Sequence, residues 1–296
     1  MRVPRAAPDH APAAGSPDAL QAPSTEDIER WIYAYLEHAP LSLTLREINR
    51  LIAVEAVASG RQPVLDVGCG DGFWWTLRDD DREVYGIDIS AREIAQAQTR
   101  IQAALTDVSR ERPFPGTQFA EIIGNCSLEH VPDIDAALSN LRKAAAPDAR
   151  LLMFVPTPRW AYQGKLQSWL LRRAPRVAMS LAGAMNGFFQ HWHLYDAKVW
   201  TRLLAQNGWQ VRATYGLGSA RSEFLFRAFM PPAFVEFLAK KLTGFYPSTL
   251  ARLMPRALLA PAARLVQWAV SDPLVPADSP TAYEYLIIAE AAEPPP

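Results

Sequence analysis

The chain has 296 residues, of which 49% are hydrophobic and 21% are charged, with a formal net charge of −1. This composition supplies ample apolar surface for a core, so it excludes a wholly disordered chain, and the length allows one large domain with elaborations. With only two cysteines, Cys69 and Cys126, a disulfide-stapled fold is excluded, and we expect free thiols in a cytoplasmic protein.

Residues 1–23 are rich in Ala and Pro, and we expect a disordered tail there. This tail lacks the apolar segment of a signal peptide. Two helices should follow within 24–60. The first starts at Ser24, which is a good N-cap residue, and the second runs from about Ser42 to Ser59.

A glycine-rich turn follows the first predicted strand. Residues 64–72 read Val-Leu-Asp-Val-Gly-Cys-Gly-Asp-Gly, and 73–77 look like the start of a helix. Strand, glycine turn and helix form the first unit of a doubly wound sheet, which binds nucleotides at the carboxyl ends of its strands. A second strand, 83–88, ends in Asp88, where a carboxylate can bind both hydroxyls of a ribose.

The spacing of the glycines distinguishes two classes of nucleotide site. A dinucleotide site requires G-x-G-x-x-G, with the last glycine under a pyrophosphate, but Phe73 occupies that position. No basic residue lies between Gly68 and Leu77, so the turn offers nothing to a phosphate. A G-x-G-x-G turn preceded by Asp66 suits instead a ligand with a zwitterionic amino-acid tail.

Four motifs, taken in order, resemble those of the class I S-adenosylmethionine-dependent methyltransferases. They are the turn 66–72, the acid-plus-apolar pair 88–89, the stretch 105–108, and the fourth strand with its following helix start, 114–133. The chain departs from the family at Ala120, where Asp is common, and at 147–149, where a Pro-Gly-Gly turn is common. The resemblance covers roughly residues 60–158 well and 190–216 loosely.

The resemblance implies a fold and a cofactor. The fold is α/β, with a doubly wound, mostly parallel seven-stranded sheet, an antiparallel last strand and helical insertions. The cofactor is S-adenosylmethionine, whose methionine, ribose and adenine would lie in turn along the ends of the first four strands. The implied cofactor-binding residues are Asp66, Gly68, Gly70, Gly72, Asp88, Ile89, Asp107, Val108 and Asn125.

Within the core, 61–158, we expect strands at 64–67, 83–88, 119–124 and 150–155. Helices should span about 90–105 and 133–146. The third strand of the family pattern is hard to find, and only a short turn at 104–107 is available for it. Beyond the core we expect a helical substrate lid (159–190), a core helix and strand (191–220), a basic amphipathic helical insertion (221–280), the last strand (281–290) and a disordered tail (291–296).

The second half of the chain is strongly basic. Residues 159–265 carry 15 Lys or Arg and three acids, a net charge of +12, which leaves −13 for the remainder. Such asymmetry indicates an anionic partner for one face. Basic amphipathic helices with Trp and Phe can lie at a membrane interface, although we favour a solvated helical lid. The basic residues alternate with Leu and Ala rather than forming a recognisable nucleic-acid module.

The expected activity is methyl transfer to a small, hydrophobic or lipid-linked acceptor, on oxygen or carbon. The alternatives are a soluble secondary metabolite or sugar as acceptor, and a binding protein that keeps the cofactor without turnover. The candidate bases are His130, His191 and His193, because histidine titrates near neutrality. No cluster has convincing metal-ligand spacing, so we expect no metal. The location would be cytoplasmic, with a peripheral place on the inner face of the membrane as an option.

Overall fold

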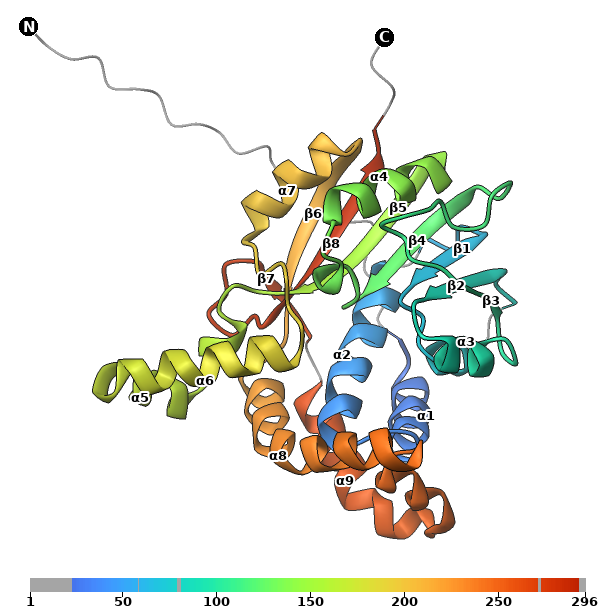
Figure 1. Ribbon diagram of the computed structural model, residues 1–296. Helices are drawn as coiled ribbons and strands as arrows, with labels where there is room; N and C mark the ends of the chain where they lie inside the picture. Colours follow the sequence, from blue (N-terminus) through green and yellow to red (C-terminus); the bar gives the residue numbers. More distant parts are fainter. Residues whose placement is uncertain (1–22, 58, 79–80, 271–272, 293–296) are drawn as a thin grey trace, which may run out of the picture.

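One eight-stranded sheet runs through the molecule, with helices packed on both of its faces (Figure 1). The computed structural model describes residues 23–57, 59–78, 81–270 and 273–292. Almost all of the expected N-terminal tail, 1–23, and the end of the expected C-terminal one lie outside these residues. The strand order is β3-β2-β1-β4-β5-β8-β6-β7.

The first five strands are parallel to one another, as predicted. Strand β8 is antiparallel to both of its neighbours, β5 and β6, which confirms the antiparallel last strand. The strands are β1 (Val64–Val67), β2 (Val84–Asp88), β3 (Gln102–Leu105), β4 (Phe119–Asn125), β5 (Ala145–Pro156), β6 (Trp209–Leu217), β7 (Leu274–Pro276) and β8 (Glu284–Ala291).

The predicted number of strands, seven, was one too low. The additional strand is β7, which has three residues and pairs antiparallel with the outer edge of β6. A strand this short shows no alternation of apolar and polar residues, so the sequence pattern gives no signal for it.

Several helices begin at an N-cap residue, as expected for Ser24. The side chains of Ser24, Ser90, Asp133 and Asp196 each accept a hydrogen bond from the backbone N–H three residues on. The α-helices are α1 (Thr25–Leu36), α2 (Leu41–Val57), α3 (Ala91–Ala97), α4 (Ile134–Ala144), α5 (Lys165–Arg173), α6 (Pro175–Phe188), α7 (Ala197–Gln206), α8 (Ala220–Thr243) and α9 (Arg256–Ala269). Short 3₁₀ segments are η1 (Phe73–Leu77), η2 (Leu128–His130), η3 (Trp160–Tyr162) and η4 (Pro247–Leu253).

Two predicted boundaries were wrong. The helix expected at 90–105 ends at Ala97, because 102–105 pair with β2 as the missing third strand. Strand β5 begins at Ala145, earlier than the predicted 150. Proline favours a helix start, but α8 runs through Pro231 and Pro232. That helix begins at the capping box of Ser219 and Ser222, a weaker sequence signal than proline.

Alternate residues of each central strand feed two hydrophobic clusters on opposite faces of the sheet. Val64 and Ile123 lie in the cluster beneath α1, α2, α8 and α9, whereas Leu65 and Ile122 lie in the one beneath α4 and α7. The insertion helices α8 and α9 therefore contribute to the main core rather than lying loosely beside it. No described helix combines the length and the apolar character needed to cross a bilayer.

Candidate active site

The glycine turn after β1 adopts a backbone that other residues rarely adopt. Gly68, Gly70 and Gly72 have φ values of 77°, 54° and 73°, all in the left-handed region. A Cβ on Gly68 would lie 2.5 Å from the Cβ of Ser127, so that position also requires glycine for space. A Cβ on Gly70 would meet no described atom within 4 Å, so open space adjoins the turn there.

Asp88, at the end of β2, is held in place by this turn. Its Oδ2 accepts a hydrogen bond from the Gly70 N–H at 3.1 Å, and its Oδ1 accepts one from the Ser90 N–H at 2.8 Å. A carboxylate has about four lone-pair positions, so two remain for the hydroxyls of a ribose. Beside it, Ile89 is 79% exposed and offers an apolar side chain to a flat base.

Two buried oxygens lie without partners at the ends of neighbouring strands β1 and β4. Asp66 is 3% exposed; its Oδ2 accepts from the Trp75 indole N–H at 2.6 Å, while its Oδ1 has no hydrogen bond from any described residue. The Asn125 amide donates to Glu47 at 2.9 Å, and its Oδ1 is likewise unpaired within the described chain. Unsatisfied buried acceptors are costly, so this place suits a ligand that carries N–H donors.

Electrostatics make the same place suitable for a cation. Burial raises the pKa of Asp66 to about 7; the Trp75 hydrogen bond lowers this pKa, and the charges of Asp88 and Glu47 raise it further. Asp66, Asp88 and Glu47 thus place three carboxylates at one end of the site. No ion pair joins Asp66 to a described residue. An ammonium group bound there would stabilise the charged form of Asp66.

The two residues predicted to contact adenine, Asp107 and Val108, already have partners within the protein. One oxygen of Asp107 accepts from the backbone and side chain of Ser109, and the other pairs with Arg110 at 3.1 Å. Val108 is buried, and its carbonyl accepts from the Asn140 amide. Both residues follow β3, next to β2, but Asp107 already satisfies a local turn, so its role toward adenine stays a prediction.

Two of the three predicted histidines lie together. The rings of His130 and His191 stack with their centroids 5.4 Å apart. Nδ1 of His130 lies 3.2 Å from the Gln190 carbonyl, to which it donates, and Nε2 lies 3.5 Å from the buried Glu129 carboxylate. Burial raises the pKa of Glu129, and the electrostatic effect of His130 acts against this rise.

His191 remains neutral over the physiological range. Burial, followed by the nearby charges of His130 and Arg46, lowers its pKa to about 3. Its Nδ1 lies 3.3 Å from Oδ1 of Asn186 and donates to it, so the lone pair of a neutral ring is on Nε2. Its Nε2 can therefore accept a hydrogen bond from an acceptor hydroxyl, but the low pKa disfavours the protonated ring.

His193 has a different environment. The ring is buried, with Nδ1 3.1 Å from the Tyr195 hydroxyl and Nε2 2.8 Å from the Val131 carbonyl. With both ring nitrogens already hydrogen-bonded, His193 fixes the loop before α7, and its role as a base stays a prediction, as do the roles of His130 and His191.

Glu129 was not among the predicted site residues, and no metal was expected from the sequence. In the structure, single ligand atoms of Glu129, His130 and His191 lie within 4.8 Å of one another, so these three could hold an ion. Glu129 and His130 lie within the Leu-Glu-His-Val stretch, but His191 comes 61 residues after His130. Spacing along the chain therefore could not reveal the cluster.

A buried ionic cluster lies between α2 and the strand ends, and the sequence analysis missed it too. Arg46 and Arg50 both bond to Glu284 at the start of β8, and Arg50 also bonds to Glu47 at 2.6 Å. A nitrogen of Arg50 lies 2.8 Å from the free thiol of Cys126. The cluster fixes helix α2 over the carboxyl ends of β4 and β5. This places α2 beside the expected site for the methionine part of the cofactor and beside the His130–His191 pair.

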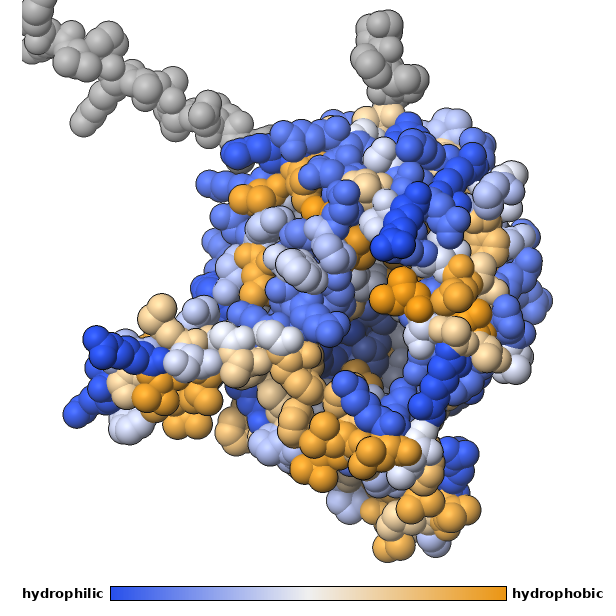
Figure 2. All heavy atoms as spheres, viewed as in Figure 1, coloured by the Kyte–Doolittle hydropathy of each residue, from blue (hydrophilic) through white to orange (hydrophobic). Residues whose placement is uncertain are grey.

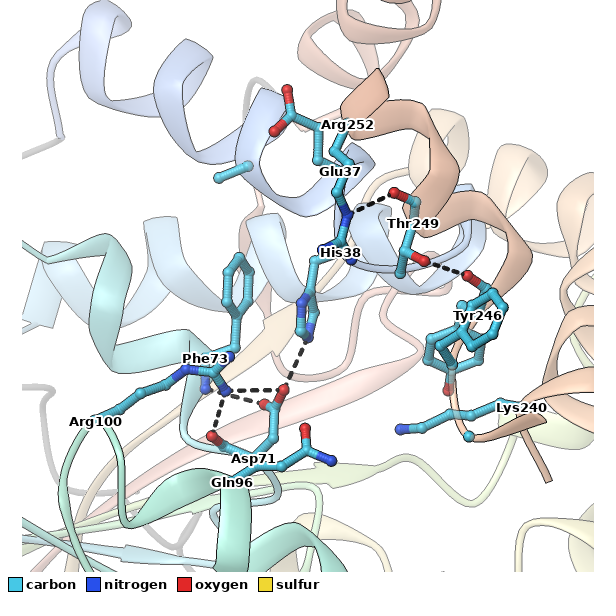
Figure 3. Close-up of a pocket in the computed structure, with 13 residues that line it drawn as sticks. Glu37, His38, Asp71, Phe73, Gln96, Arg100, Lys240, Tyr246, Thr249 and Arg252 are labelled. Atoms are coloured by element: carbon cyan, nitrogen blue, oxygen red, sulfur yellow. Dashed lines mark hydrogen bonds and ion pairs between the residues drawn. The ribbon is translucent and has the colours of Figure 1, made fainter. Parts of the chain in front are cut away.

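A cavity of about 500 Å³ lies beside the glycine turn (Figure 3). Its walls come from the end of α1, the turn, α3, and the segment after α8. Asp71 of the turn bonds to His38 at 3.2 Å and to Arg100 at 3.0 Å, and Lys240 of α8 reaches Glu93 of α3 at 3.4 Å. The helical insertion thus closes one side of this cavity, which adjoins the glycine turn but is lined by none of the predicted cofactor-binding residues.

Comparison with known proteins identifies the family. A model of a methyltransferase domain matches residues 35–214, more than half of the chain. The chain belongs to this methyltransferase family. It is 32% identical over 142 residues to uncharacterized methyltransferases of Mycobacterium tuberculosis and Mycobacterium bovis, a stretch that covers 46% of this chain and 68% of theirs.

Solved structures with a similar arrangement include the [4+2]-cyclase SpnF, at 19% identity and a TM-score of 0.49, covering 84% of this chain and 81% of that one. Another is an S-adenosylmethionine-dependent methyltransferase of Thermotoga maritima, at 12% identity and a TM-score of 0.49, covering 90% of this chain and 95% of that one.

This methyltransferase uses S-adenosylmethionine as cofactor, and the residues present fit that molecule. The unpaired oxygens of Asp66 and Asn125 match an ammonium, the oriented carboxylate of Asp88 matches a ribose, and exposed Ile89 matches a purine. Open space adjoins Gly70, whose N–H donates to Asp88.

Proposed function

We propose that this methyltransferase acts on an oxygen or carbon of a small hydrophobic or lipid-linked acceptor. The supporting observation is the surroundings of His191. Trp160 of η3 contacts its ring edge to face with centroids 4.9 Å apart, and Phe189 stacks on it at 5.7 Å. Phe226 of α8 lies beyond Trp160. An imidazole enclosed by aromatic rings suits an apolar acceptor with one reactive group.

The chemistry requires little beyond position and one proton acceptor. When bound, S-adenosylmethionine supplies a methyl group on a sulfonium that is already a good leaving group. The protein aligns the acceptor with that methyl, and the aromatic side chains exclude water. As the acceptor oxygen bonds to the methyl carbon, the carbon–sulfur bond breaks and its electron pair goes to sulfur. The hydroxyl proton passes to Nε2 of His191.

His130 and Glu129 are proposed to support this step. The stacked His130 ring restricts the orientation of His191, and the Glu129 carboxylate, 3.5 Å from Nε2 of His130, in turn restricts the His130 ring. For a carbon acceptor, the same Nε2 would take the proton from the methylated carbon.

The test uses cofactor labelled in its methyl group, together with a cell extract separated into lipid and aqueous fractions. We expect label in the lipid fraction with the native protein and much less with the Asp88→Ala variant when the cofactor is kept below its native Kd. Label confined to the aqueous fraction would contradict the proposal and indicate a soluble metabolite or sugar as acceptor.

A further inference from the structure

Exposed apolar side chains are concentrated in one part of this protein. Of the 22 large hydrophobic side chains exposed in the described ranges, 20 lie between Tyr162 and Trp268. Soluble surfaces carry such residues singly, and a contiguous group marks a surface that contacts something else. Figure 2 shows them on the projecting arm and along the lower rim, over the helices that Figure 1 labels α5–α6 and α8–α9.

The first part of this surface is the α5–α6 hairpin. Helix α5 buries none of its nine residues, and α6 buries only Ala178 and Ala182. Leu166 and Trp169 on α5, and Val177 and Met179 on α6, are all more than half exposed. A short helix normally depends on burial of an apolar face, and within the monomer this hairpin has little.

The second part is the corner formed by the end of α8, η4 and the start of α9. Here Leu242 is 89% exposed and Leu253 is 78% exposed, with Val235 and Leu258 also mostly exposed. The two parts meet at Phe188, whose ring contacts Phe234 at 4.8 Å and Phe237 at 5.3 Å. The apolar surface is therefore continuous from the hairpin to the corner.

The charge of this surface indicates what covers it. Residues 165–188 and 234–258 contain eight basic residues and one acid, Glu236. One oxygen of the Glu236 carboxylate accepts a hydrogen bond from the Ser248 N–H, so this acid is bonded within the corner itself. Leucine, tryptophan and phenylalanine beside lysine and arginine match a bilayer with anionic lipid headgroups, which takes up both kinds of side chain at once.

The surface also leads to the active site. Phe188 ends α6, the adjacent Phe189 packs edge to face against it at 5.0 Å, and Phe189 in turn stacks on His191. An apolar acceptor in the bilayer would thus meet a continuous row of aromatic rings between the membrane and the proton acceptor.

We propose that the α5–α6 hairpin and the α8–α9 corner dock this methyltransferase on an anionic membrane surface. Docking is a property of the surface alone. It can be measured with no acceptor present, so its failure is distinguishable from failure of the proposed methylation.

The test is sedimentation of the full-length protein with vesicles of phosphatidylglycerol and phosphatidylcholine in equal parts, compared with phosphatidylcholine alone. We expect binding to the mixed vesicles that weakens with salt. The variant Arg172→Gln/Arg173→Gln should weaken it by roughly fivefold per side chain, the scale for one basic residue near an anionic surface. Its control, Lys198→Gln/Arg202→Gln, removes the same charge from exposed positions on α7 and should bind like the native protein.

A second variant tests the apolar contribution. Trp169→Ser/Leu242→Ser changes two exposed side chains outside the active site and should leave the thermal unfolding midpoint unchanged while vesicle binding falls at least tenfold. Failure to sediment with the mixed vesicles, or equal loss in the α7 control, would overturn the proposal. So would a solution dimer that this variant dissociates, since a second copy would then be what covers the surface.

Discussion

At the residue scale, Asp66 couples cofactor binding to protonation. Its pKa is raised to about 7 mainly by burial, so near pH 6.5 a substantial part of the free protein carries a proton there. A cationic amino group bound beside Asp66 lowers that pKa. We therefore predict that S-adenosylhomocysteine, which has the same amino-acid tail, releases up to one proton on binding at pH 6.5.

Calorimetry in two buffers of different ionisation enthalpy would measure this release. In Asp66→Asn the dependence on buffer should vanish while some affinity remains. A buffer dependence of the same size in Asp66→Asn would show that another group releases the proton.

His191 and His193 provide a second comparison of single residues. His191→Ala should lower kcat by about 10²-fold or more, the usual scale for a lost general base, with little change in affinity for the cofactor. Since the pKa of His191 is about 3, its protonation should not reduce the rate between pH 7 and pH 5. The measurement is a kcat profile against pH for both proteins.

His193→Ala is the matched control, because it removes the same side chain two positions away. It breaks two internal hydrogen bonds and should lower the free energy of unfolding by about 1–3 kcal/mol while the folded fraction keeps its kcat. Equal losses of kcat in both variants would count against His191 as the base.

At the scale of elements, the ionic cluster that fixes α2 determines much of the stability around the site. Glu284 is fully buried and bonds two arginines, and these arginines hold its pKa at about 2 against the opposing effect of burial. Glu284→Gln removes the anion that the two buried arginines share, although Arg50 keeps the Glu47 carboxylate. We predict a loss of about 3–5 kcal/mol in the free energy of unfolding, measured by urea titration.

The pH dependence of this contribution follows from the lowered pKa. The stabilisation is complete above the ordinary carboxyl pKa of 4.5 and is lost as the pH falls from there to about 2. The control is Glu290→Gln, which breaks the exposed pair with Arg212 and should cost only about 0–1 kcal/mol. Similar costs for the two variants would contradict a dominant role for the buried cluster.

The sequence predicted those parts of the fold and site that depend on short stretches of chain. The glycine turn, the carboxylate of Asp88 and the capping residues lie in local patterns whose geometry follows from backbone sterics and hydrogen bonding. The partners of Arg50 could not be found this way, because Glu284 is 234 residues distant and nothing local marks either residue. The aromatic surroundings of His191 likewise come from three separate elements.

At the scale of the whole molecule, the two faces of the sheet have different roles. One face of the sheet carries α4 and α7 and serves as scaffold, while the other carries the helices that enclose the site and the basic insertion. The insertion touches the cofactor side through Lys240 and the acceptor side through Phe226. Binding of the cofactor should therefore stabilise the whole fold rather than one loop.

We predict that S-adenosylhomocysteine at about 100 times its Kd adds about 2.7 kcal/mol to the free energy of unfolding. For a chain of this size that corresponds to a rise in Tm of about 4 °C, whereas NAD at the same concentration should give none. Asp88→Ala should reduce affinity roughly tenfold or more and so reduce the shift at fixed ligand concentration. Asp81→Ala, an exposed acid that precedes β2 at its opposite end, should keep the full shift. A shift with NAD, or an undiminished shift in Asp88→Ala, would mean that the carboxylate at the end of β2 does not bind the ribose of this cofactor.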